Sequence, residues 1–145
     1  MNVVHSLIVY NTELKNLGQI RKEIERIGSE LGVDEGDVYD LSLAATEVVT
    51  NTIEHGYHGA QGPIEVEISQ QGSDIVLYVR DNAPPFDPTT LEDPDLNLPL
   101  EKRPLGGMGV YLAKKVVDDM RYSQSDRWAN ELALVKKSII RLQKS

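Results

Sequence analysis

The stretch PIEVEISQQGSDIVLYVRD, residues 63–81, decides the expected fold, because its apolar residues recur at every second position on either side of the turn QGSD. This period predicts an antiparallel β-hairpin with one solvated face. The positions expected to face the core are Ile64, Val66, Ile68, Ile75, Leu77 and Val79. Counting on by two reaches Asp81, which predicts an inward carboxylate at the strand end that needs a hydrogen-bond donor.

Two helices are predicted before the hairpin, after a short strand near Val3–Val9. The first is expected to begin after a cap at Asn11 or Thr12 and to end at Gly32. Its apolar stripe comprises Leu14, Leu17, Ile20, Ile24, Ile27 and Leu31. The second runs from about Asp37 to His55, with acidic residues at its start and an apolar face of Leu41, Ala44, Ala45, Val48, Val49 and Thr52.

The chain after the hairpin begins with a long irregular segment. Residues 82–105 contain six of the seven prolines and show no apolar period, which is typical of a functional or disordered loop. A glycine cluster at residues 106–109 then opens a third helix, and two strands are expected near 120–123 and 131–140. With 145 residues and no internal repeat or linker, residues 1–145 are predicted to form a single domain.

Composition excludes several classes of function. The net charge is −8 and neither end carries a run of Lys and Arg, so direct nucleic-acid binding is not expected. No segment approaches the roughly 18 consecutive apolar residues of a membrane helix, so a soluble protein is expected. The absence of cysteine and of a basic leader predicts a cytoplasmic location.

A polar pair on the second helix suggests phosphate chemistry. Glu47 and Asn51 are four residues apart and therefore project side by side from one face. The Asn51 amide oxygen can ligate a Mg²⁺ ion that also holds phosphates, and Glu47 can act as a general base beside it. The alternative is an ordinary solvated helix flank.

Asp81 and the glycine cluster complete a candidate nucleotide site. The Asp81 carboxylate can accept a hydrogen bond from an adenine amino group, although an Asp that initiates a turn before Asn82 is the alternative. The cluster of Gly106, Gly107 and Gly109 lets backbone amides approach phosphates at a helix start. A plain tight turn is the alternative for this cluster.

Three motifs in this order resemble those of the Bergerat-type ATPases, which include gyrase, chaperones and histidine kinases. EVVTNTIEHGY (Glu47–Tyr57) resembles their N box, and GGMGVYLAKKVVD (residues 106–118) resembles the second glycine box. DNAPPFDP (Asp81–Pro88) resembles the first glycine box as it occurs in stand-alone anti-sigma factor serine/threonine kinases. The resemblance implies an α+β fold: a two-layer α/β sandwich with a mixed, mostly antiparallel sheet and helices on one face.

The same resemblance implies roles for individual residues. Glu47 is the expected catalytic base, Asn51 the Mg²⁺ ligand and Asp81 the adenine-binding residue. The other expected ATP-binding residues are Pro85 and Phe86 in the adenine pocket, and Gly106, Gly107, Met108, Gly109 and Val110 at the phosphates. Residues from about 88 to 105 would form a lid, in which Lys102 or Arg103 reaches a phosphate or, alternatively, both are solvated.

Two positions depart from the wider pattern. Ala83 stands where a glycine is usual, so fewer backbone conformations are open to the chain beside the adenine. Asn130-Glu131 stands where many members have a Gly-Thr pair whose threonine assists adenine binding. Asn130 is therefore the candidate substitute for that contact.

The resemblance implies a serine/threonine protein kinase with ATP and Mg²⁺ as cofactors. Its expected partners are an anti-anti-sigma protein as substrate and a sigma factor as sequestered ligand, in a homodimer. The alternative is a nucleotide-dependent partner-switching module without significant kinase activity. A histidine kinase fragment is disfavoured because no helix with a phospho-acceptor histidine precedes the domain in this sequence.

Overall fold

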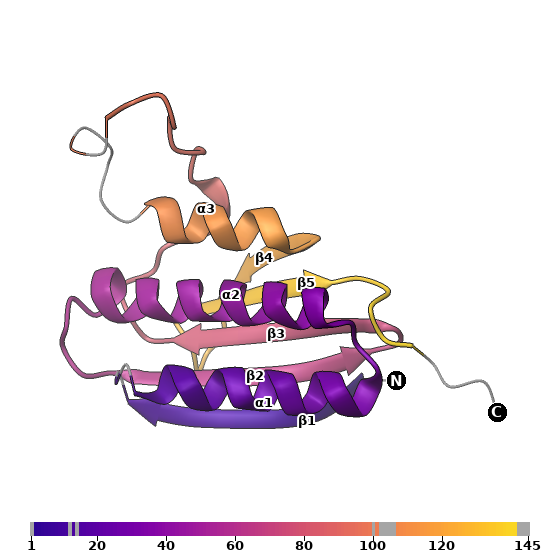
Figure 1. Ribbon diagram of the computed structural model, residues 1–145. Coiled ribbons are helices and arrows are strands. Elements are labelled where there is room, and N and C mark those ends of the chain that lie inside the picture. Colours follow the sequence, from indigo (N-terminus) through magenta and orange to yellow (C-terminus); the bar gives the residue numbers. More distant parts are fainter. Residues whose placement is uncertain (1, 12, 14, 100, 102–106, 142–145) are drawn as a thin grey trace.

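The structure, a computed structural model, describes residues 2–11, 13, 15–99, 101 and 107–141 (Figure 1). The elements in chain order are β1 (Asn2–Asn11), α1 (Asn16–Leu31), α2 (Glu35–Asn51), the π-helical turn η1 (Thr52–Gly56), β2 (Pro63–Gln71), β3 (Asp74–Asp81), the 3-10 turn η2 (Pro88–Thr90), α3 (Gly107–Val116), β4 (Asp119–Ser123) and β5 (Asn130–Lys136). Lys102, Arg103 and Gly106 lie outside the described residues.

The strands form a five-stranded sheet in the order β1-β2-β3-β5-β4. Each neighbouring pair within the described residues is antiparallel, whereas a mixed, mostly antiparallel sheet was expected. Figure 1 shows α1, α2 and α3 together on one face of this sheet. The predicted α+β two-layer sandwich is confirmed.

The hairpin of β2 and β3 has the predicted alternation and turn. Ile68 pairs with Leu77 and Ile64 pairs with Asp81, so the side chain of Asp81 shares the core-facing side. Gly72 occupies the turn with φ of 64°, a left-handed conformation that favours glycine. Asp81 is only 6% exposed, as its position along the strand predicts.

The prediction of a solvated second face for the hairpin is wrong near its open end, where Glu65 pairs with Arg80. Glu65 is buried on that face, where Arg80 forms ion pairs with it, with Glu67 and with Glu131 at 2.6–3.1 Å. Further along, Val76 packs against residues of β5. Long side chains from neighbouring strands therefore cover each other on a face that no helix in the described part of the chain covers.

The two long helices begin at different residues from those predicted. Asn11 belongs to β1, where it pairs with Pro63, and α1 begins at Asn16 after Lys15. Thr12 lies outside the described residues. The predicted stop at Gly32 is confirmed, because Gly32 has φ of 70° and its N–H donates to the Gly28 carbonyl.

The second helix changes its hydrogen-bond pattern before it ends. The α-helix stops at Asn51, four residues before the predicted end, and continues as the π-helical turn η1. The Tyr57 N–H donates to the Thr52 carbonyl at 2.8 Å and closes this wider turn. Single π turns within helices are frequent at functional sites.

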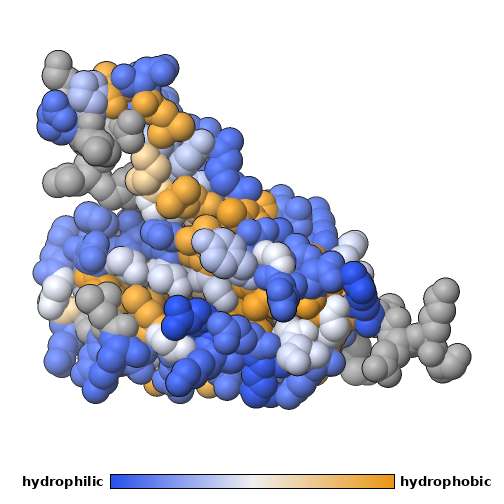
Figure 2. Space-filling model, viewed as in Figure 1, coloured by the Kyte–Doolittle hydropathy of each residue, from blue (hydrophilic) through white to orange (hydrophobic). Residues whose placement is uncertain are grey.

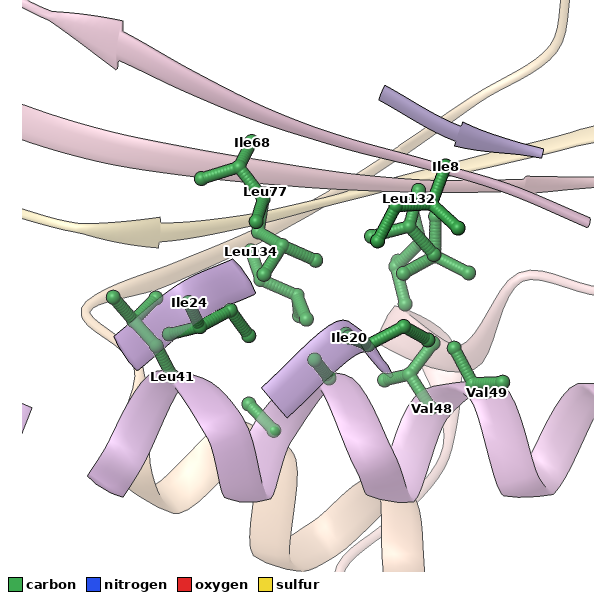
Figure 3. Packing of buried hydrophobic residues seen from close by; sticks show 14 of the residues in the cluster. Ile8, Ile20, Ile24, Leu41, Val48, Val49, Ile68, Leu77, Leu132 and Leu134 are labelled. Atoms are coloured by element: carbon green, nitrogen blue, oxygen red, sulfur yellow. The ribbon is translucent and has the colours of Figure 1, made fainter. Parts of the chain in front are cut away.

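The core lies between the helices and the sheet. Figure 3 shows side chains of α1 and α2 pointing toward those of the strands. The labelled members are Ile20 and Ile24 of α1, Leu41, Val48 and Val49 of α2, and Ile8, Ile68, Leu77, Leu132 and Leu134 of the sheet. Each fully buried aliphatic side chain stabilises the fold by roughly 1.5–3 kcal/mol, so this layer holds α2 firmly against β3 and β5.

The last strand is shorter than predicted. β5 ends at Lys136 rather than near residue 140, because Ser138 adopts a left-handed φ of 57° and turns the chain. The N–H groups of Ile139 and Ile140 then donate to the Ser73 carbonyl in the β2–β3 turn. Within the described ranges, no helix is long and apolar enough to cross a membrane.

Candidate functional site

A pocket of about 710 Å³ lies beside the end of α2, between the sheet and the 82–99 loop. This volume falls within the range of roughly 300–1,000 Å³ that is usual for small-molecule sites. Its walls come from α2 and η1 (Val48, Asn51, Thr52, His55, Gly56), from the turn after η1 (His58), from the sheet (Val79, Asp81, Tyr122, Asn130, Leu132), from the loop (Ala83, Pro84, Pro85, Phe86, Pro88, Leu91, Glu92, Asp93, Pro94, Asp95, Leu98) and from Val110 of α3.

Asp81 lies in the wall of this pocket with hydrogen-bond donors on both oxygens. Its Oδ1 accepts from the Ala83 N–H at 3.0 Å and from Asn130 Nδ2 at 2.8 Å, and its Oδ2 accepts from the Thr52 hydroxyl at 3.2 Å. The inward carboxylate therefore has the donors it needs. The Ala83 contact is the local turn expected of an Asp, so the turn role and a place in the pocket coexist.

Thr52 and Asn130 both contact Asp81. The sequence did not assign Thr52 to the site, and it named Asn130 only as the candidate substitute for the usual threonine. Thr52 was expected on the apolar face of the second helix, and its hydroxyl reaches Asp81 from the first residue of the π turn. Asn130 pairs directly with Asp81 in the β3–β5 register. A local pattern cannot reveal either contact, although the departure at Asn130 marked that position.

Tyr57 holds the first residue of the 82–86 loop close to the start of β2. The Tyr57 hydroxyl donates to the Pro63 carbonyl at 2.8 Å and accepts from the Asn82 N–H at 2.7 Å. Burial raises the pKa of the Tyr57 phenol above its ordinary value, so the hydroxyl stays protonated at neutral pH. It can therefore serve both neighbours at once.

Ala83 is accommodated by a glycine on the opposite wall. Ala83 is 3% exposed, and a Cβ added to Gly56 would lie only 3.0 Å from the Ala83 Cβ. A methyl group at position 56 would therefore crowd the methyl group of Ala83. The alanine that departs from the usual glycine is matched by Gly56 at the end of η1.

Glu47 lies at the edge of the site rather than in the pocket wall. It is half-buried on α2, one turn before Asn51, and the pocket lining includes Asn51 but not Glu47. A Cβ added to Gly109 would lie 2.7 Å from Glu47 Oε2, so the two residues are in close contact. The structure thus brings Glu47 against the first turn of α3.

The first turn of α3 contains the described part of the glycine cluster. Gly107 begins the helix, followed by Met108, Gly109 and Val110, of which Val110 is buried in the pocket wall. The first N–H groups of a helix have no partners within it and carry partial positive charge. This end of α3 can therefore receive an anion beside Glu47 and Asn51.

The 82–99 loop forms the outer wall and rises beyond α3 in Figure 1. Its base is fixed by Lys114 of α3, whose Nζ donates to the carbonyls of Leu91 at 3.1 Å and Thr89 at 3.4 Å. Phe86 is 48% exposed at the rim. Figure 2 shows apolar surface gathered over α3 and this loop, in contrast to the largely polar surface over α1.

The charges around the pocket limit how it can bind an anionic ligand. The described lining contains Asp81, Glu92, Asp93 and Asp95 but neither Lys nor Arg. No group of three or more metal-ligating carboxylate, His or Cys side chains is present within residues 2–11, 13, 15–99, 101 and 107–141. A polyphosphate here would therefore be best neutralised by a cation that it brings with it, held by Asn51 and phosphate oxygens.

The histidine kinase-like ATPase domain family matches this chain over residues 10–136. The chain belongs to that family. The match spans α1 to β5 and so includes every wall of the pocket.

Curated relatives give a more specific comparison than the family does. The chain is 28% identical over 106 residues to the serine-protein kinase RsbW of Bacillus mycoides, and 27% identical over 106 residues to that of Bacillus cereus strain G9842. Each match covers 70% of this chain and 66% of the relative, slightly less than two thirds of its length. These matches confirm the predicted resemblance to the anti-sigma factor serine/threonine kinases.

A solved structure supports the fold. A Mycobacterium tuberculosis protein, crystallised as its RsbU and RsbW domains, aligns with 90% of this chain and 32% of its own, with a TM-score of 0.60. The sequence identity is 18%, so this similarity concerns the fold alone.

Proposed function

We propose that this protein binds Mg²⁺-ATP in the pocket beside α2 and transfers the γ-phosphoryl group to a serine or threonine of a partner protein. One observation carries the proposal: Asn51 and Asp81 share one pocket, while Glu47 lies one turn away against the start of α3. The family match adds ATP as the expected nucleotide.

The adenine is proposed to bind at the inner end of the pocket. There Asp81 accepts a hydrogen bond from the exocyclic amino group, with Pro85 and Phe86 forming an apolar wall. The phosphates would extend toward the start of α3, where Gly106, Gly107, Met108, Gly109 and Val110 supply backbone contacts. Asn51 would ligate Mg²⁺, which compensates for the absence of Lys and Arg from the described lining.

Transfer is proposed to depend on position and charge rather than on a covalent enzyme intermediate. The hydroxyl oxygen of the partner bonds to the γ-phosphorus as the bond to the bridging oxygen breaks and ADP leaves. Glu47 is proposed to accept the hydroxyl proton. It is partly exposed and lies against the first turn of α3, toward which the phosphates are proposed to extend. Residues from about 88 to 105 are proposed as a lid over the nucleotide, and one of Lys102 and Arg103, both outside the described residues, is proposed to contact a phosphate.

The partners proposed are those implied by the resemblance to anti-sigma kinases. An anti-anti-sigma protein would be the phosphorylation substrate, and a sigma factor would be sequestered in the cytoplasm. A homodimer is supported by apolar side chains on the outer face of the edge strand β1, where Val4, Leu7 and Val9 are 55–57% exposed. Contiguous exposed apolar residues commonly mark protein interfaces.

A phosphotransfer assay tests the proposal. Radiolabelled ATP is mixed with the protein and an anti-anti-sigma partner encoded in the same genome, and label on the partner is measured. We expect Glu47→Gln to lower transfer by about 100-fold or more, the usual contribution of a general base. Nucleotide binding by this variant should be retained.

The matched control is Glu54→Gln, which changes the same residue type at an exposed position outside the pocket lining. It should transfer label like the wild type. If the wild type binds ATP but labels no partner, the kinase proposal is wrong and the partner-switching module without kinase activity takes its place.

A further inference from the structure

Asn130 uses its whole carboxamide within the pocket wall. It is the first residue of β5 and is 8% exposed. Its Nδ2 donates to Asp81 Oδ1 at 2.8 Å and to the Ala83 carbonyl at 3.0 Å. Its Oδ1 accepts from the Phe86 N–H at 3.0 Å and from the Tyr122 hydroxyl at 2.6 Å. A carboxamide has two N–H donors and two acceptor positions, so all four are occupied.

These four contacts fix the orientation of the amide. If Asn130 were flipped, its oxygen would face the Asp81 carboxylate and its NH₂ would face the Phe86 N–H. Both arrangements are unfavourable, because like partners would meet in a buried site. Asn130 therefore presents a donor to Asp81 and an acceptor to the loop.

The contacts also determine which oxygen of Asp81 is free to bind a ligand. Oδ1 already accepts from Asn130 and from the Ala83 N–H, while Oδ2 accepts from Thr52. A carboxylate oxygen accepts about two hydrogen bonds. Counting the described partners, the remaining acceptor position is on Oδ2, beside Thr52.

We propose that Asn130 is a positioning residue that makes this pocket selective for adenine. By occupying Oδ1 and holding the carboxylate plane, it directs the vacant acceptor position of Oδ2 to the exocyclic amino group of the base. This inference rests on the proposed binding of ATP. Adenine carries a donor at that position, whereas hypoxanthine carries a carbonyl acceptor that a carboxylate repels. A site built to pair with one hydrogen-bonding group rejects the analogue that lacks it.

The tyrosine behind the amide supports this role and supplies a gentler variant. Tyr122 of β4 donates to Asn130 Oδ1 from the side away from Asp81. Its hydroxyl therefore holds the amide in place without touching the carboxylate. Removing that hydroxyl leaves the ring and the fold intact but loosens the amide.

The test compares the binding of ADP and IDP, which differ in the group at position 6 of the base. Both dissociation constants are measured by calorimetry for the wild type, Asn130→Asp and Tyr122→Phe. Asn130→Asp keeps the shape of the side chain but sets an oxygen against Asp81 Oδ1 in place of the donor. We expect its ADP affinity to fall about tenfold, with IDP affinity changed less than about threefold.

The matched control is Asn82→Asp, the same chemical change one residue after Asp81. Asn82 is exposed, lies outside the pocket lining, and uses its Oδ1 to accept from the Ala129 N–H, a contact that aspartate retains. Its ratio of ADP to IDP affinity should match the wild type. Tyr122→Phe should lower this ratio by about threefold and decides the matter if Asn130→Asp does not fold.

Three outcomes would overturn the inference. Unchanged selectivity in Asn130→Asp and Tyr122→Phe removes the positioning role, and so does an equal loss of ADP and IDP affinity, which indicates a purely structural contact. Wild-type protein that binds neither nucleotide overturns the proposed function itself, and this result is distinguishable from the other two.

Discussion

Gly56 and Ala83 lie in close contact in the wall of this pocket. Gly56 ends the π turn, and a methyl group added there would lie 3.0 Å from the Ala83 Cβ. Because Ala83 is also buried against Asp81 and Asn130, it has little room to move away. A larger side chain at either position therefore requires a smaller one at the other.

We expect Gly56→Ala to destabilise the protein by roughly 1–3 kcal/mol through overpacking, and Ala83→Gly to restore most of that loss in the double variant. Chemical denaturation measures both free energies of unfolding. Gly36→Ala is the control, since nothing lies within 4 Å of its added methyl group in the first turn of α2. If Gly56→Ala proves as stable as this control, the contact is not tight.

The sequence predicted some site residues better than others, for physical reasons. Asp81 and Asn51 follow from strand alternation and helical period, which are local, and both lie in the pocket as described. Thr52 and Asn130 depend on a π turn and on the pairing of strands 49 positions apart in the chain. Neither feature leaves a local pattern that a period can detect.

The loop and α3 act together at the level of elements. Lys114 of α3 donates to the carbonyls of Thr89 and Leu91, and Asp87 caps η2 by accepting from the Thr89 N–H at 2.9 Å. These contacts fix the point from which the proposed lid leaves the body. A nucleotide beneath the lid should therefore dissociate faster when the anchor is removed.

We expect Lys114→Met to raise the rate of ADP dissociation by about 3- to 30-fold, the equivalent of one or two hydrogen bonds, with little change in thermal stability. Stopped-flow release of a fluorescent ADP analogue measures this rate. Lys115→Met is the control, because Lys115 is exposed on the same helix and its ammonium lies over the Tyr111 ring instead. Equal rates for the two variants would show that the anchor does not restrain the loop.

Element types were more predictable than element ends. The hairpin, the two long helices and the two late strands all occur in the predicted order. Their ends differ where long-range contacts decide, as at β5, which stops when Ile139 and Ile140 bond to the β2–β3 turn. The expected cap of α1 failed because Asn11 completes β1 beside Pro63.

At the scale of the whole molecule, the helices cover one face of the sheet, and no helix of the described residues covers the other (Figure 1). The uncovered face has a charged centre at Arg80 and its three carboxylate partners. Its β1 edge carries Leu7 and Val9, on the side opposite the buried Ile8. This edge is the surface at which we propose that two copies meet.

Leu7→Lys is therefore expected to convert dimer to monomer, because a charge on an apolar interface costs its desolvation on burial. Sedimentation velocity over a range of concentrations measures the change. Tyr39→Lys serves as the control, since Tyr39 is 66% exposed on α2 in the helical layer. A wild type that stays monomeric throughout, or a Leu7→Lys variant that still dimerises, would contradict this interface.

The central claim is that the pocket holding Asp81 and Asn51 binds Mg²⁺-ATP, and a calorimetric titration tests it most directly. Wild-type protein should bind saturably, and Asp81→Asn should weaken binding by about 100-fold, because the amide cannot reproduce the buried acceptor. Asp126→Asn, in the exposed β4–β5 loop outside the pocket, should bind like the wild type. Absence of saturable binding by the wild type, or undiminished binding by Asp81→Asn, would contradict the account.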